Sequence, residues 1–202
     1  RDTSVTGVQT CALPILVGDE LVLNKPSIAI IGCRDASDYG KRVAFNFAYE
    51  LAKEGFVIVS GLARGIDTYA HLGAVKANGK TIAVLGSGLK HIYPAENKEL
   101  CNEIVKKGGA VITEYEPHIK PLPMNFPSRN RIISGLSNGV LVVEAKQKSG
   151  TLITVDYALE QGKDVFVIPG NITSTNSYGT NELIKQGAKP VTNIQEIIEE
   201  II

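Results

Sequence analysis

The sequence predicts an α/β fold with a doubly wound, mostly parallel sheet of about six or more strands in a single domain. Short apolar runs rich in valine and isoleucine alternate with longer amphipathic stretches, the pattern of strand–helix–strand units. Almost every apolar run ends in a loop that contains glycine or serine. The chain has 202 residues, of which 44% are hydrophobic, so it is long enough to bury one sizeable core.

The strands are expected where the apolar runs are short and continuous, because the strands of a parallel sheet are covered on both faces. They are Ile28–Ile31, Val57–Ser60, Thr81–Leu85, Ala110–Thr113, Val140–Val143 and Val165–Ile168. Helices are expected over Asp38–Glu54, Ile66–Asn78, Ala95–Lys107, Ser128–Leu136, Thr151–Gln161, Asn181–Gln186 and Ile194–Ile202. The last helix has its own start signal, with Asn193 as the N-cap and Glu196 as its partner.

The N-terminal stretch does not fit this pattern. Residues 1–15 lack the basic start and the long apolar run of a signal peptide, and they build no clear element. Their sequence is typical of a translated sequencing adapter. We therefore expect residues 1–15 to be non-native or disordered and the domain to cover residues 16–202.

The charges are balanced overall but segregated along the chain. There are 21 basic and 21 acidic side chains, yet five basic residues stand against one acid, Glu144, between Lys120 and Lys148. A neutral protein can bind a polyanion when its cations gather on one face. The three cysteines and three histidines are isolated, and no apolar run approaches the ~20 residues of a membrane span. We therefore predict a cytoplasmic protein without a metal site, a cofactor or a membrane segment.

Function is expected at the carboxyl ends of the strands, where open parallel sheets bind ligands. Pro127 and Ser128 indicate the start of a helix, with Ser128 as its N-cap. Arg129 and Arg131 follow directly. A helix start flanked by guanidinium groups attracts phosphate, so we expect an anion site here.

Three glycine-containing loops are further candidates. In the loop of residues 60–67, Gly61 and Gly65 would let backbone amides approach an anion beside Arg64, although a purely structural turn is the alternative. The segment Gly86, Ser87, Gly88 and Lys90 resembles half of a dinucleotide fingerprint, and we favour a loop that faces a polyanion. The third loop is the helix start at Ser149, Gly150 and Thr151, for which ordinary capping is the alternative.

Two glutamates, Glu114 and Glu144, each end a predicted strand. Catalytic carboxylates often stand at such positions. Because Arg129 and Arg131 are close in sequence, we expect these glutamates to pair with arginines instead.

Six motifs resemble those of the DNA-processing protein A family, also called DprA or Smf, in order and spacing over about residues 16–202. They are IAIIGCR (28–34), SGLARGID (60–67), YPAEN (93–97), FPSRNRIISGL (126–136), SGTLIT (149–154) and IPG (168–170). The resemblance implies an extended Rossmann-like domain that binds single-stranded DNA, protects incoming DNA in natural transformation and loads the RecA recombinase. It implies no enzyme activity and suggests a homodimer.

The resemblance also transfers site residues. The implied DNA contacts are Arg34, Arg64, Lys90, Lys120, Arg129, Asn130 and Arg131, and the residues that shape a nucleotide pocket are Gly61, Gly65, Gly86, Ser87, Gly88, Ser149, Gly150 and Thr151. Cys33 stands where the family usually has serine. Many relatives add a helical N-terminal domain and a winged-helix-like C-terminal domain, and we expect this chain to have neither.

Aromatic side chains are few, so we expect backbone charge and glycine-loop amides to dominate DNA binding, with Phe126 and Tyr93 available to bases. Two other functions stay open. A phosphoribohydrolase of the LOG type would need a P-G-G-x-G-T-x-x-E segment, but Thr154 stands where its glutamate would fall. A nucleotide sensor would keep the pocket and bind a mononucleotide about as well as a long strand.

Overall fold

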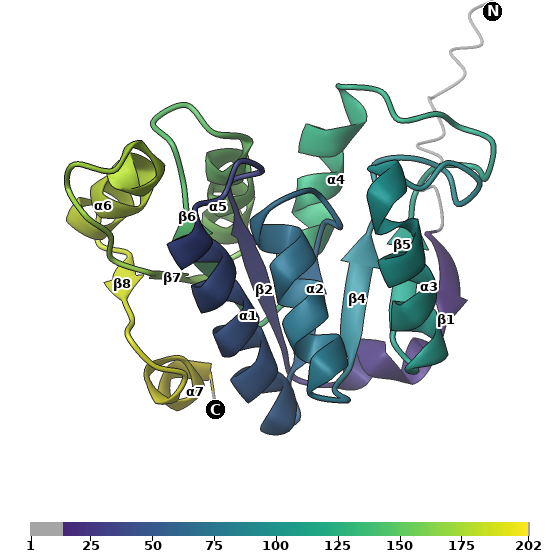
Figure 1. Ribbon diagram of the computed structural model, residues 1–202, viewed down its shortest axis with the longest axis horizontal. Coiled ribbons are helices and arrows are strands. Elements are labelled where there is room, and N and C mark those ends of the chain that lie inside the picture. The colour runs from purple at the N-terminus through teal and green to yellow at the C-terminus, as the bar shows by residue number, and fades with distance from the viewer. Residues whose placement is uncertain (1–13, 202) are drawn as a thin grey trace, which may run out of the picture.

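The computed structural model describes residues 14–201. These residues form one eight-stranded sheet with the order β1-β5-β4-β3-β2-β6-β7-β8 (Figure 1). All neighbouring strands are parallel except β1 and β5, which are antiparallel. The strands are β1 (Ile15–Gly18), β2 (Ser27–Gly32), β3 (Val57–Ser60), β4 (Thr81–Val84), β5 (Ala110–Thr113), β6 (Gly139–Glu144), β7 (Asp164–Val167) and β8 (Lys189–Pro190).

The six central strands confirm the predicted ones to within one residue at each end. The sequence did not predict the two edge strands. β1 begins at Ile15, the last residue of the N-terminal segment 1–15, and Ile15 pairs with Thr113 of β5. β8 has two residues and no apolar run. Of residues 1–15, which we expected to be non-native or disordered and to build no element, residues 1–13 lie outside the described residues, and Ile15 corrects the expectation because it belongs to β1.

Seven α-helices and three short 3₁₀ helices lie within residues 14–201. The α-helices are α1 (Asp38–Lys53), α2 (Ile66–Lys76), α3 (Lys98–Lys106), α4 (Asn125–Gly135), α5 (Gly150–Glu160), α6 (Tyr178–Lys185) and α7 (Gln195–Ile201). The 3₁₀ helices are η1 (Glu20–Asn24), η2 (Ala95–Asn97) and η3 (Thr175–Ser177). At the start of α7, the Asn193 side chain accepts a hydrogen bond from the Glu196 amide at 3.2 Å, as the capping signal predicts.

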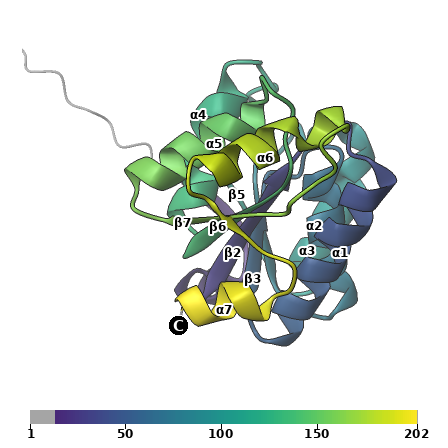
Figure 2. The same ribbon diagram turned by 90° about the vertical axis from the view of Figure 1, so that its left-hand side faces the viewer.

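The helices cover both faces of the sheet, as Figures 1 and 2 show. Ile28 and Ile30 of β2 pack with α1, α2 and α7, whereas Ala29 and Ile31 face the layer of α4, α5 and α6. Both isoleucines facing α1 are fully buried, and each such burial contributes about 1.5–3 kcal/mol. Because the strands carry apolar side chains on both faces, the sheet is stable only when helices cover each face.

The chain reverses its winding direction at β2. From β2 it runs outward through β3, β4 and β5, and it then returns to place β6 on the other side of β2. This is the doubly wound arrangement that the sequence predicts. Ligands of such sheets bind at the carboxyl ends of the strands that flank the reversal, here β2 and β6.

Candidate functional site

A cleft of about 670 Å³ opens at the carboxyl ends of β2 and β6. Its walls are the loop after β2, the first turns of α4, and the segment that joins β6 to α5. A smaller side pocket of about 40 Å³ adjoins it and shares the lining residues Arg34, Ala63, Tyr93 and Phe126. The cleft thus lies where the topology places the ligand site of this fold.

The cleft is cationic. The charged residues that line it are four cations and two carboxylates: Arg34, Arg129, Lys146, Lys148, Asp35 and Asp67. Lys146 Nζ lies 3.1 Å from Asp35 Oδ2, whereas neither Arg34 nor Lys148 has an ion-pair partner among residues 14–201. A cleft with this balance and two free cations attracts anions.

The ring of Phe126 forms an aromatic centre in the cleft. The guanidinium carbon of Arg34 lies 5.3 Å from the ring centroid, and that of Arg129 lies 5.9 Å from it. Tyr93 contacts the same ring with a centroid distance of 5.7 Å and a tilt of 52°. These distances are typical of cation–π and aromatic pairs, so Phe126 holds the Arg34 guanidinium in place.

The predicted helix start at Ser128 is wrong. α4 begins at Asn125, and the Ser128 hydroxyl donates to the Met124 carbonyl instead of capping the helix. Pro127 falls in the first turn, where its missing N–H costs nothing. Arg129 and Arg131 are therefore not beside the helix start but within the helix, about 200° apart around its axis, so that they point to opposite sides.

Arg129 points inward and is 4% exposed. Its Nη1 donates to the carbonyl of Gly61 at 2.7 Å and to that of Val84. Burial lowers the pKa of the guanidinium to about 10, and the nearby Asp67 carboxylate opposes that shift. Arg129 is therefore charged at neutral pH and ties the ends of β3 and β4 to α4.

The Asp67 carboxylate accepts hydrogen bonds from the loop amides that we expected to bind an anion. Its Oδ2 accepts hydrogen bonds from Gly61 N at 3.1 Å and from Ala63 N at 3.4 Å. Burial raises the pKa of this carboxyl, and the charge of Arg129 counteracts the rise. The expectation that these amides cradle a ligand is wrong, because the loop closes on its own carboxylate.

The glycines of this loop serve close packing. A Cβ on Gly61 would lie 2.6 Å from a guanidinium nitrogen of Arg129. Gly65 has φ of +73°, and a Cβ there would lie 2.2 Å from the carbonyl oxygen of Cys33. Both positions need glycine for the fold, whatever the ligand.

The loop after β4 is also covered by protein. A Cβ on Gly86 would lie 2.8 Å from the Phe126 ring, and the Ser87 hydroxyl donates to the His91 carbonyl at 2.7 Å. The Gly88 amide donates to the Ile119 carbonyl at 2.8 Å. These three residues are buried and line neither the cleft nor the side pocket, so a contact with a polyanion at this loop stays a prediction.

The remaining predicted cations divide into two groups. Lys90, Lys120 and Arg131 are exposed and line neither cavity. Arg131 instead pairs with Glu114, which confirms the expected pairing of that glutamate. Arg64 lines the side pocket with Gly61 and is paired with Glu96. The structure thus brings Arg34, Arg64 and Arg129 together and leaves Lys90 and Arg131 apart, and DNA contacts at the outlying residues stay predictions.

The start of α5 reaches the cleft. Ser149, Gly150 and Thr151 line it together with Asn130 of α4. The Ser149 hydroxyl caps the helix by accepting from the Thr151 amide at 3.2 Å. Ordinary capping therefore holds at this position, and it leaves the positive end of the α5 dipole facing the cleft.

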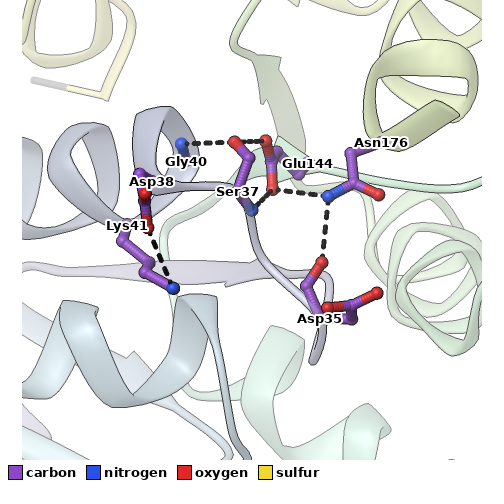
Figure 3. Close-up of polar contacts among 7 residues, drawn as sticks. All are labelled: Asp35, Ser37, Asp38, Gly40, Lys41, Glu144 and Asn176. Carbon is purple, nitrogen blue, oxygen red and sulfur yellow. Dashed lines mark hydrogen bonds and ion pairs between the residues drawn. The ribbon is translucent and has the colours of Figure 1, made fainter. Parts of the chain in front are cut away.

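Glu144 supports the loop that carries Arg34. Its buried carboxylate accepts from the Ser37 amide at 3.0 Å, from the Ser37 hydroxyl, and from Asn176 Nδ2 at 3.2 Å (Figure 3). Asn176 also donates to the Asp35 carbonyl at 2.9 Å. The expected pairing of Glu144 with an arginine is wrong, because three neutral donors satisfy the carboxylate and fix the loop after β2.

Two cations of the cleft, Lys146 and Lys148, were not among the predicted site residues. β6 ends at Glu144, so both lysines follow a strand at the same edge as Arg34. The signal that would have identified them is their position directly after a central strand.

Two further features of the described residues bear on the class of site. No helix within residues 14–201 has the length and apolar character needed to cross a membrane. In the same part of the chain, histidine, cysteine and acidic side chains do not gather in groups of three that could hold a metal ion.

Residues 10–202 match the family model described as DNA recombination-mediator protein A. The chain is 46% identical over 185 residues to the DNA processing protein DprA of Bacillus subtilis, covering 91% of this chain and 62% of the relative. It is 48% identical over 184 residues to the protein Smf of Escherichia coli, covering 91% and 49%. The chain thus spans about half to two thirds of the length of these curated relatives.

Solved structures agree with these matches. DNA processing protein A from Streptococcus pneumoniae superposes with a TM-score of 0.87 at 45% identity, over 94% of this chain and 66% of that one. DNA processing protein A from Helicobacter pylori, described for its single-stranded DNA binding mode, gives a TM-score of 0.84 at 34% identity, over 97% and 93%. A molybdenum cofactor binding protein from Rippkaea orientalis, at 23% identity and a TM-score of 0.62 over 88% and 95%, shares the fold.

Proposed function

This chain belongs to the DNA recombination-mediator protein A family, and from that premise we propose that it binds single-stranded DNA in the cleft between the loop after β2, α4 and the start of α5. One observation carries the proposal. Arg34 is exposed, has no ion-pair partner among the described residues, and lies over Phe126 in a cleft with more cations than carboxylates. Such a group is free to exchange its counterion for a phosphate.

Each wall of the cleft has a distinct part in this binding. The positive charge of Lys148 and the positive end of the α5 helix dipole can bind one phosphate together. The Arg34 guanidinium packs on Phe126, so its outward face offers a flat, charged surface for a base or a phosphate. The volume of about 670 Å³ is that of a small-molecule site, which suits a few nucleotides of one strand better than a duplex.

The finer roles follow from the family resemblance. We propose that the protein protects incoming DNA in the cytoplasm and passes it to the RecA recombinase, and that it acts as a homodimer. Two clefts on one dimer would raise the avidity for a long strand. Thr154, which lines the cleft, stands in the sequence where a phosphoribohydrolase of the LOG type would have its glutamate, so the proposal includes no catalytic step.

Fluorescence anisotropy over a salt series tests the DNA-binding proposal. We expect a preference for single-stranded over duplex oligonucleotides and a slope of log affinity against log salt of roughly −3, the value for about four neutralised phosphates. Lys148→Ala should weaken binding several-fold, whereas Lys185→Ala, on α6 and paired with Glu182, should leave it unchanged.

Two results would contradict the proposal. A slope near zero would show that phosphates are not neutralised in the cleft. Equal affinity for a mononucleotide and a long strand would instead favour the nucleotide sensor.

A further inference from the structure

Arg64 is held by an acidic neighbour at the edge of the side pocket. Its Nε lies 2.6 Å from Glu96 Oε1 and its Nη2 lies 2.8 Å from Glu96 Oε2, so the guanidinium and the carboxylate meet through two parallel contacts. Both side chains are 56% exposed. The same fork of donors that binds a carboxylate in this way also binds a phosphate.

The position of Glu96 is fixed by the fold. Glu96 belongs to η2, and the next residue, Asn97, is buried at 6% exposure. Asn97 Nδ2 donates to the Leu62 carbonyl and to the Thr68 hydroxyl, each at 2.8 Å. These bonds tie η2 to the loop after β3 and to α2, on either side of Arg64, so the two charged groups are set facing each other.

The two arginines of the side pocket therefore differ in whether they have an ion-pair partner. Arg34 has no anionic partner among the described residues, whereas Arg64 has one that occupies two of its donors. An ion pair at this exposure is weak in water, so a phosphate can displace it. Arg64 lowers the pKa of the Glu96 carboxyl, chiefly through the hydrogen bonds between them, so mild acid does not remove the pairing.

We propose that Glu96 sets the affinity of the cleft by competing with DNA phosphate for the guanidinium of Arg64. The proposal rests on the proposed function, since it concerns the same nucleic-acid ligand. A strand gains the Arg64 contact only by displacing Glu96, and the displaced carboxylate then repels the phosphate. Arg34 binds first, and Arg64 adds little while Glu96 is present.

The test is anisotropy with a single-stranded oligonucleotide over a salt series. Glu96→Gln removes the competing charge and should tighten binding about three- to tenfold at ~0.15 M salt. One further phosphate would be neutralised, so the salt slope should steepen by about 0.7. Glu96→Ala also removes the hydrogen bonds that glutamine can retain, and it should tighten binding at least as much.

Two comparisons make the test specific. Glu114→Gln breaks the Glu114–Arg131 pair outside the cleft with the same change in net charge, and it should alter affinity less than twofold. The double variant Arg64→Ala/Glu96→Gln should lose the gain of Glu96→Gln, because the gain depends on the freed guanidinium.

Each outcome decides one question. If the natural chain does not bind the oligonucleotide, the proposed function fails. If it binds but Glu96→Gln and Glu96→Ala bind no tighter, the competition is refuted and the DNA site stands. If the double variant Arg64→Ala/Glu96→Gln keeps the gain in affinity, or if Glu114→Gln shows the same gain, the competition is also refuted. The gain would then come from a general reduction in the charge repulsion between protein and DNA.

Discussion

Arg34 and Arg129 approach the same phenylalanine ring from two regions of the molecule, and they differ in almost every other respect. Arg34 comes from the loop after β2 and is exposed, without an ion-pair partner among the described residues. Arg129 comes from the inner side of α4, is 4% exposed, and donates to two carbonyls at the ends of β3 and β4. One arginine is available to a ligand, and the other holds the cleft together.

The difference shows that burial and partners, not residue type, separate a binding cation from a structural one. A buried guanidinium must satisfy its donors within the protein, because an unpaired buried charge is very costly. An exposed one keeps its hydration and can exchange it for phosphate. We therefore expect Arg129 to affect DNA binding only through the shape of the cleft, and Arg34 to contact the DNA directly.

The largest expected effect is on the buried side of this comparison. Arg129→Met should lower the free energy of unfolding by about 3–5 kcal/mol, because it leaves two strand-end carbonyls without their donor and removes the positive charge that counteracts the burial of the Asp67 carboxylate. Urea denaturation measures it. Arg129→Lys is the matched control, since it keeps the charge and should lose less. A loss below about 1 kcal/mol for Arg129→Met would show that the buried arginine is not structural.

The next effect concerns acid stability in the same buried region. His71 is fully buried, its Nδ1 lies 2.7 Å from Thr81 Oγ1, and burial, aided by the charge of Arg129, lowers its pKa to about 3. An unfolded histidine titrates near pH 6.5. Between about pH 6.5 and pH 3 only the unfolded chain takes up this proton. The free energy of unfolding therefore decreases as the pH is lowered, by up to ~1.4 kcal/mol per pH unit.

Unfolding free energies at pH 7 and pH 5 check this prediction. The natural chain should lose about 2 kcal/mol through His71 over that interval, and His71→Gln should lack that part of the pH dependence. His118→Gln, at an exposed position, should keep it. An unaltered pH dependence in His71→Gln would show that this histidine is not the group responsible.

The smallest effect is expected on the exposed side, and it appears in binding, not in stability. Arg34→Ala should weaken single-stranded DNA binding about tenfold, or 1.4 kcal/mol, with the unfolding free energy within about 0.5 kcal/mol of the natural value. Arg34→Lys should give an intermediate affinity, because it keeps the charge and loses the flat surface over Phe126.

Arg131→Ala is the control for Arg34. It breaks an exposed ion pair outside the cleft and should change affinity less than twofold. Equal losses for Arg34→Ala and Arg131→Ala would erase the distinction between the cleft and the rest of the surface.

Much of the fold follows from local patterns in the sequence. The six central strands and the capping of α5 and α7 depend on apolar runs and side chains only a few residues apart. The helical period also places Arg129 and Arg131 on opposite sides of α4, although the helix start itself was misplaced because Pro127 is compatible with a first turn. These features need no knowledge of how distant segments meet.

The roles of the site residues, in contrast, depend on contacts between segments that are distant in the sequence. The sequence placed Arg34 and Arg64 directly after central strands and Arg129 near a helix start, and it predicted that all three belong to one edge of the sheet. Whether each guanidinium is free, paired with Glu96, or buried against strand-end carbonyls depends on residues 32 to 68 positions away in the chain. Asp67 likewise takes the loop amides that glycine spacing alone assigned to a ligand.

The sequence by itself determined a doubly wound sheet and the edge at which a ligand is expected, because apolar periodicity and strand order act through neighbouring residues and chain direction. Only the tertiary structure decided which cations line the cleft at that edge. Charge availability depends on burial and on through-space partners, and both are set when α4, η2 and the strand-end loops pack together.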